Sequence, residues 1–267
     1  MATRNLAASA RGPLTLSLRA GMADVTVTAS RDVPLALALI TGPEDVVDGV
    51  TERMRGGEWE ITLPGTDSGA TVISSYGGGR TVIRGRVNSG VIIGGDNYGS
   101  TVIQAGGRVV VNGVDVSDVV NARGGDNTPL RVAVLLPAGS SLETEASSGD
   151  LRASGPLDRV IASSSSGDVH VAESRSLRAK TASGDIDADR TGTADVRSMS
   201  GSAVISAASG DVDADTMSGS IVVHCTAAVR VSARSMSGSV RVTADRGVMP
   251  RVSARSMSGR VSTPEGR

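Results

Sequence analysis

The C-terminal half of the chain repeats a short pattern, clearest in Ser200-Gly-Ser-Ala-Val-Ile205, Ser218-Gly-Ser-Ile-Val-Val223 and Ser237-Gly-Ser-Val-Arg-Val242. A Ser-Gly pair recurs every 17 to 21 residues, and apolar side chains follow each pair at alternating positions. The glycines of these pairs are Gly149, Gly167, Gly184, Gly201, Gly219, Gly238 and Gly259. Alternation with a period of two is typical of β-strands that bury one face. The repeat therefore predicts short strands separated by corners.

A unit of this length cannot bury its own apolar face, but a stack of copies can. We therefore predict an all-β fold, namely a single-stranded β-solenoid (β-helix-like) with a small N-terminal strand and helix cap. The solenoid is expected over residues 129–267 as about seven coils of 17 to 21 residues. A second turn signal lies within most units, at Gly155, Gly192, Gly210 and Gly247, where we expect a backbone with positive φ.

The N-terminal residues 1–65 predict a β cap with one short helix that shields the first coil. Alternating strands are expected at Leu14–Leu18 and Val25–Val27, separated by a hairpin-like break. A capping-box pattern followed by apolar residues at helical spacing predicts a helix at about 43–55. The strand Glu58–Leu63 is expected to follow the helix.

Residues 66–128 follow a different period and form a Gly-rich insertion. Pairs of Val and Ile recur every ten residues there, for example at Val82-Ile83, Ile92-Ile93 and Val102-Ile103. This spacing predicts a shorter solenoid or a hairpin array inserted into the main one.

Composition excludes several classes of protein. The chain has 27 basic and 28 acidic residues, a net charge of −1, and only 1% aromatic residues, so it lacks both the basic field and the stacking platform of nucleic-acid-binding proteins. Two His and one Cys leave little for a zinc site and exclude an internal disulfide. We expect no cofactor, no metal site and no nucleic-acid partner.

No apolar stretch typical of a secretory signal begins the sequence, and the longest apolar run, Leu35–Ile40, is too short to cross a bilayer. We therefore expect no membrane insertion and a cytoplasmic location.

Several segments, in their order along the chain, resemble the bacterial "putative adhesin" β-solenoid family of unknown function, whose members carry repeated SGD or SGN units. The similar segments include Gly12–Leu18, Asp24–Val27, Val132–Gly139 and the units Ser148-Gly-Asp150, Ser166-Gly-Asp168, Ser183-Gly-Asp185 and Ser209-Gly-Asp211. The resemblance implies a solenoid and an adhesin-like binding role, and it brings no catalytic or ligand-binding residues.

The insertion resembles amyloid signalling motifs, which pass a signal by templated β-stacking between chains. Val91–Gly99 is similar to the fungal prion-type pattern, and Ser100–Gly106 is similar to the core of the bacterial motif. The resemblance implies possible self-association through Val91, Ile92, Ile93, Asn97, Tyr98, Val102, Ile103 and Gln104. An ordinary solenoid insertion explains the same residues.

Four methionines, Met199, Met217, Met236 and Met257, each stand two positions before a repeat glycine. We expect them to point inward and fill irregular space at a corner. Cys225 is expected to be buried, whereas His170 and His224 fall on outward positions. Because neighbouring side chains of a strand point to opposite faces, His224 and Cys225 cannot form a thiol–imidazole pair.

The triplets Asp185-x-Asp187-x-Asp189 and Asp211-x-Asp213-x-Asp215 start like a calcium loop but lack its later Gly and Glu. We interpret them as solvated strand faces, and we expect Asp150, Asp168, Asp185 and Asp211 to bond turn amides beside their glycines. The chain contains no nucleophile elbow or phosphate-binding loop.

We therefore predict that the chain is not an enzyme, but a non-catalytic scaffold or adhesin-like binding protein. Its partner is an unknown protein or a second copy of itself, which makes a homo-oligomer possible. One alternative is a self-assembly or signalling module acting through residues 86–108. A second alternative is a polysaccharide-active solenoid enzyme, which would need paired acids in a cleft.

Overall fold

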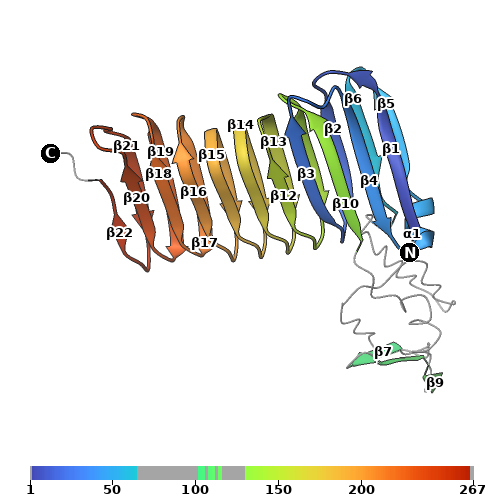
Figure 1. Ribbon diagram of the computed structural model, residues 1–267. Coiled ribbons are helices and arrows are strands. Elements are labelled where there is room, and N and C mark those ends of the chain that lie inside the picture. Colours follow the sequence, from blue (N-terminus) through green and yellow to red (C-terminus); the bar gives the residue numbers. More distant parts are fainter. Residues whose placement is uncertain (1, 65–101, 106–107, 112–113, 116–129, 265–267) are drawn as a thin grey trace. The chain divides into compact units, whose positions relative to one another are not determined.

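The computed structural model describes residues 2–64, 102–105, 108–111, 114–115 and 130–264 (Figure 1). Contacts divide the chain into two compact units, Met1–Thr66 together with Pro129–Arg267, and Asp67–Thr128. The finer division into 1–65, 66–128 and 129–267 stays a prediction.

The first unit is built almost entirely of strands. These are β1 (Ala2–Arg11), β2 (Thr15–Gly21), β3 (Asp24–Ser30), β4 (Leu35–Gly42), β5 (Thr51–Arg55), β6 (Glu58–Thr62), β10 (Arg131–Pro137), β11 (Ser141–Ala146), β12 (Leu151–Ser154), β13 (Leu157–Ser164), β14 (Val169–Thr181), β15 (Ile186–Ser198), β16 (Ala203–Ala208), β17 (Val212–Ser218), β18 (Ile221–Cys225), β19 (Arg230–Ser237), β20 (Val240–Ala244), β21 (Arg251–Ser256) and β22 (Val261–Ser262). The β-solenoid predicted from the repeats is confirmed (Figure 1).

Successive coils stack in parallel on two faces. One face runs β3–β12–β14–β15–β16–β18–β20–β22, and the other runs β2–β11–β13–β14–β15–β17–β19–β21. The 13-residue strands β14 and β15 belong to both faces, since their first halves pair on one face and their second halves on the other. Equivalent residues of neighbouring coils therefore form rows along the stack, about 4.8 Å apart.

The thin core is made of the alternating residues that the repeat predicts. The pairs Leu151/Ala153, Val169/Val171, Ile186/Ala188, Ala203/Ile205, Ile221/Val223 and Val240/Val242 are all buried. Cys225 is also buried, as expected, and it aligns with Ala208 after a register shift between Ile205 and Ala208. The single Trp59 is buried as well, in the N-terminal part of the unit.

The repeat glycines serve close stacking rather than positive φ. A Cβ at Gly167, Gly184 or Gly201 would overlap the carbonyl oxygen of the glycine one coil earlier. Of the four mid-unit glycines, Gly155 and Gly247 have positive φ, as predicted. For Gly192 and Gly210 the prediction is wrong, because their Cβ atoms would instead meet backbone of the preceding coil.

At the N-terminal end, the strands are not simply a cap that precedes the first coil. β10 lies between β3, to which it is parallel, and β4, to which it is antiparallel. The expected hairpin of β2 and β3 is wrong, because these strands lie on opposite faces and pair with β11 and β12. β2 and β3 thus form a coil of the solenoid, and β1, β4, β5 and β6 lie beyond it.

The helix is shorter than predicted. Helix α1 spans Glu44–Asp48, and the residues Thr51–Arg55 form β5 instead of continuing it. Gly49 ends the helix, and a turn through Gly56 and Gly57, both with positive φ, folds β5 back onto β6 in an antiparallel pair. The hairpin therefore overrides the helical spacing of Val50 and Met54. The predicted strand at Glu58–Leu63 is confirmed as β6.

In the second unit the structure describes three strands, β7 (Val102–Ala105), β8 (Arg108–Val111) and β9 (Val114–Asp115). Both pairings, β7 with β8 and β8 with β9, are antiparallel.

Candidate functional site

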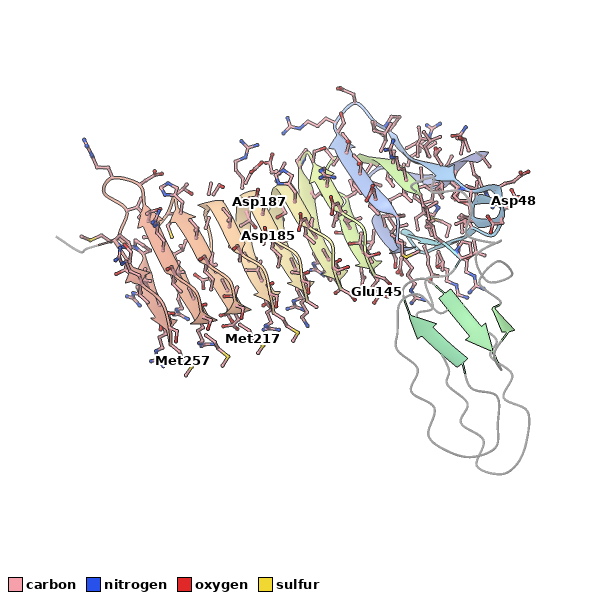
Figure 2. The ribbon with its side chains drawn as sticks, turned by 90° about the horizontal axis from the view of Figure 1, so that it is seen from below. Asp48, Glu145, Asp185, Asp187, Met217 and Met257 are labelled. Atoms are coloured by element: carbon pink, nitrogen blue, oxygen red, sulfur yellow. The ribbon has the colours of Figure 1, made fainter. Side chains whose placement is uncertain are left out.

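The four methionines that the sequence predicts to be buried are exposed. Met199, Met217, Met236 and Met257 have 55%, 48%, 49% and 80% of their surface accessible. The residue before each of the first three, Ser198, Thr216 or Ser235, is buried, so the alternation of the strand turns the methionine outward. Met217 and Met257 project from the same long edge of the stack (Figure 2). We call these four residues the methionine row.

Hydroxyl groups beneath the methionine row hold the corner together. Ser198 Oγ donates to the Gly184 carbonyl at 3.4 Å, and Ser235 Oγ donates to the Gly219 carbonyl at 3.0 Å. Ser256 Oγ donates in the same way to Gly238 at 2.7 Å. The equivalent hydroxyl of Thr181, on the first of these coils, is buried without a hydrogen-bond partner. The corner that carries the methionines is therefore fixed by polar contacts inside the coil.

A row of charged side chains runs parallel to the methionine row, two residues earlier on each strand. It consists of the aligned residues Lys180, Arg197, Asp215, Arg234 and Arg255, which we call the charged row. Arg197 pairs with Asp195 at 3.3 Å, and Arg234 pairs with Asp215 at 3.6 Å. Among the described residues, Lys180 and Arg255, at the two ends of the charged row, have no ion pair.

A groove of about 1000 Å³ lies along this edge. The methionine row, the charged row and the hydroxyl residues line it, together with Ala254 and Val261 in the last coil. Its walls are mainly apolar, because the methionine thioethers and the aliphatic stems of the basic side chains face it. Asp215 is the single carboxylate among the described residues that line the groove.

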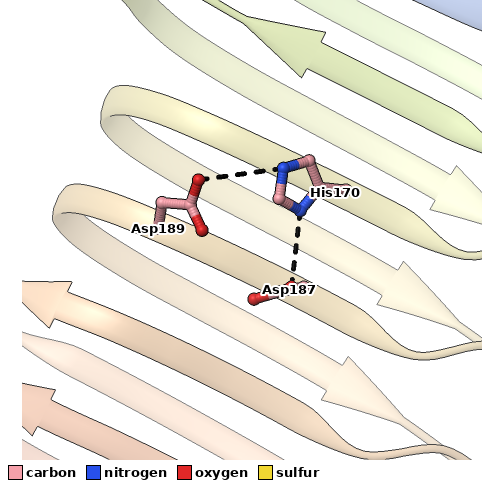
Figure 3. Close-up of side chains that lie close together, drawn as sticks. All are labelled: His170, Asp187 and Asp189. Atoms are coloured by element: carbon pink, nitrogen blue, oxygen red, sulfur yellow. Dashed lines mark ion pairs between the residues drawn. The ribbon is translucent and has the colours of Figure 1, made fainter.

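His170 of β14 lies beside two carboxylates of β15 on another part of the surface (Figure 3). Its Nδ1 is 3.4 Å from Asp187 Oδ2, and its Nε2 is 3.8 Å from Asp189 Oδ2. One ligand atom of each residue lies within 4.8 Å of the others. Two carboxylates and one imidazole nitrogen fall short of the six or more oxygen ligands that calcium takes, so we assign no metal to this cluster.

The first member of the triplet, Asp185, instead bonds the neighbouring coils. Its Oδ1 accepts a hydrogen bond from Ser202 N at 2.7 Å, and Asp168 Oδ1 accepts one from Asp185 N at 2.9 Å. Asp150 Oδ1 accepts one from Asp168 N at 3.2 Å, and Asp211 Oδ1 accepts one from Arg230 N at 3.0 Å. These carboxylates therefore bond backbone amides, as predicted, but the amides belong to the next coil.

His224 and Cys225 point to opposite faces of β18. His224 Nδ1 is 2.9 Å from Thr243 Oγ1, and its Nε2 is 3.1 Å from Asp245 Oδ1. Cys225 is buried, and burial raises the pKa of its thiol. The pair therefore offers no activated thiolate, which agrees with the reasoning from strand geometry.

The residues named for self-association lie in the second unit. Val102, Ile103 and Gln104 belong to β7, where they pair with Val111, Val110 and Val109 of β8. Val91, Ile92, Ile93, Asn97 and Tyr98 lie outside the described residues. Self-association through this segment stays a prediction.

The profile of one protein family, Toastrack DUF4097, matches residues 94–267. This chain belongs to the Toastrack DUF4097 family. The match contains the methionine row and the charged row together with every coil from β11 onward. No curated protein matches the Toastrack chain.

Several solved structures are similar to this chain. A "putative adhesin" of Bacteroides fragilis is 12% identical, with 98% of this chain and 97% of that chain covered and a TM-score of 0.54. A "putative adhesin" of Parabacteroides merdae is 11% identical, with 99% and 96% covered and a TM-score of 0.45. A "putative lipid binding protein" of Parabacteroides distasonis is 14% identical, with the same coverage and a TM-score of 0.43. At 12% identity the likeness to the Bacteroides fragilis structure shows the fold alone.

The family match supports the expectation of a solenoid family of unknown function, and the adhesin-like role stays a prediction. The SGD or SGN repeat type and the amyloid-like insertion stay predictions. In the described part of the Toastrack chain, no helix has the length and apolar character needed to cross a membrane.

Proposed function

We propose that this Toastrack protein is a non-catalytic scaffold that binds its partner along the groove between the methionine row and the charged row. The proposal includes a cytoplasmic location and a partner other than nucleic acid. The observation that carries it is the exposure of four methionines at the same position of successive coils. Exposed apolar side chains that gather in one place mark binding surfaces more often than isolated ones do.

Rigidity supports the same function. Each corner of the groove is tied to its neighbours by backbone hydrogen bonds, such as Ser200 N to the Ala182 carbonyl at 2.9 Å and Ser218 N to the Met199 carbonyl at 2.8 Å. A partner would therefore meet a surface whose backbone is already ordered, and binding would cost little backbone entropy.

The acid content of the groove favours a scaffold over a polysaccharide-cleaving enzyme. Glycoside hydrolysis needs two carboxyl groups facing one bond. The groove offers Asp215 alone among its described residues, and that carboxylate pairs with Arg234. A smaller pocket of about 210 Å³ near β5 and β6 likewise contains one acid, Glu60.

Site-specific photo-cross-linking in the native cell tests the scaffold. A photoreactive amino acid at Met217 should give a light-dependent adduct with a cellular component, whereas the same residue at Met249 should not. Met249 is a matched control because it is exposed but does not line the groove. Adducts of equal yield from both positions, or none from Met217, would contradict a binding role for the groove.

A further inference from the structure

The groove suits one class of ligand better than others. We propose that it binds a single long-chain anionic amphiphile, such as a fatty acid, with the chain lying along the methionine row and the anionic head at a basic end of the charged row. This inference rests on the proposed function, since it names the partner that the groove takes.

The walls fit a flexible hydrocarbon chain. Methionine side chains are unbranched and polarizable, so a row of them can adapt to an apolar ligand of variable shape. The groove spans the coils from Thr181 to Val261 and is continuous along them. From Lys180 to Arg255 the charged row covers four coil steps, or about 19 Å at about 4.8 Å a step.

The distribution of charge selects the sign of the head group. Carboxylates hold the two middle arginines, Arg197 and Arg234. Lys180 and Arg255 have no such partner among the described residues, so each end of the groove carries a cation free to meet an anion. A cationic head would be repelled at both ends.

The backbone of the corner argues against a peptide. Met199 N donates to the Thr181 carbonyl at 3.2 Å, and Ser258 N donates to the Met236 carbonyl at 3.0 Å. Because these groups are already paired within the stack, an extended peptide cannot add to them as a strand. Its own N–H and C=O groups would lie over thioethers without partners, which is costly. A hydrocarbon chain has no such groups.

A second copy of the chain and a bilayer fit less well. Two copies facing each other through this edge would bring like-charged rows together, which is unfavourable. A bilayer surface would touch the exposed methionine tips and leave the groove between the rows unfilled. The groove therefore favours a free amphiphile.

Calorimetric titration of the full chain with dodecanoate, below its micelle concentration, tests the inference. We expect one bound molecule per chain and no binding of dodecyltrimethylammonium, which has the same chain and a cationic head. The double variants Met217→Ser/Met236→Ser and Lys180→Glu/Arg255→Glu should each weaken binding at least tenfold. All four side chains are exposed, so the substitutions should leave the fold intact. An unchanged thermal unfolding temperature would show that the variants fold.

The matched controls are Met249→Ser and Arg241→Glu, which change an exposed methionine and an exposed arginine away from the groove. Both should bind dodecanoate like the wild type. The inference would be overturned if the cationic amphiphile bound as well as dodecanoate, or if the groove variants and the control variants had equal effects. It would also be overturned if the chain bound only to phosphatidylglycerol vesicles or only to an acidic peptide. Absence of dodecanoate binding together with a protein adduct at Met217 would overturn it and leave the scaffold standing. Absence of any adduct at Met217 would overturn the scaffold itself.

Discussion

Gly201 lies directly against Gly184 of the preceding coil, so closely that a Cβ on Gly201 would overlap the Gly184 carbonyl oxygen. The same contact recurs between Gly219 and Gly201 and between Gly238 and Gly219. The repeat keeps glycine at these corners because the parallel stack leaves no room for a side chain there.

Gly201→Ala is therefore expected to lower the free energy of unfolding by about 1–3 kcal/mol, as overpacking does. Denaturant unfolding followed by circular dichroism would measure the change. The control is Ser200→Ala, one residue earlier and exposed, which should have almost no effect. An unchanged unfolding midpoint for Gly201→Ala would contradict the prediction, because it would show that the backbone at this corner can move apart to accommodate a Cβ.

Val223→Asp should be among the most damaging single substitutions. Val223 is fully buried in β18, and a carboxylate there would have no partner, a situation that costs about 3–5 kcal/mol. Val222→Asp is the matched control because the neighbouring side chain points to the other face. Equal losses of thermal stability in the two variants would contradict the alternation.

Cys225 should react slowly with thiol reagents in the folded protein. Burial raises the pKa of its thiol, so the reactive thiolate is scarcer at pH 8 than in an exposed cysteine. Labelling with iodoacetamide, followed by mass spectrometry, should reach completion only after denaturation. An added exposed cysteine, Ser239→Cys, provides the control, since it should react at once in the native state. Rapid native labelling of Cys225 would mean that β18 opens.

His170→Ala should change stability by less than about 1 kcal/mol, because the ion pairs of His170 with Asp187 and Asp189 are solvent-exposed. Thermal unfolding at pH 7 would show it. A larger loss would indicate that the cluster stabilises the joint between β14 and β15.

The peptide 86–108 is expected to form fibres, because its Val91–Ile93 and Thr101–Gln104 segments combine high β-propensity with low charge. Thioflavin fluorescence and sedimentation of the peptide and of the full chain would test this. Ile92→Lys should abolish assembly, since a charge repeated at each step of a stack repels its neighbours. A soluble, monomeric peptide at high micromolar concentration would end the signalling hypothesis.

The stack could be predicted from the sequence because the inward positions are set locally. Ile221 and Val223 follow Gly219 at the same offsets as Val240 and Val242 follow Gly238, although the length of the coil varies from 17 to 21 residues. The expectation that the methionine row points inward is wrong, although the sequence contains the signal for the opposite face. Alternation continued from Val196 through Ser198 puts Met199 outside.

Other features depend on partners that no local pattern specifies. The sequence of Leu130–Pro137 is typical of a buried strand, but its alternation does not say that β3 and β4 will be its neighbours. The helix after Thr41 ends at Asp48, and the residues Thr51–Arg55 pair with β6 instead of continuing it. The ion pair of Arg234 with Asp215 likewise depends on the register that aligns these two residues in adjacent coils.

The place of β10 between β3 and β4 sets an order of events during synthesis. Arg131 pairs with both Asp24 and Thr41, so the sheet around these early strands cannot close until the ribosome has released the residues up to Pro137. Until then the edges of β3 and β4 that pair with β10 have no partner, and such unpaired edges can pair with other nascent chains. Each later coil pairs with the coil before it, so the rest of the solenoid can add one coil at a time as it is translated. Because the insertion lies between β6 and β10 in the sequence, it is translated before β10 and lengthens the interval during which these edges have no partner.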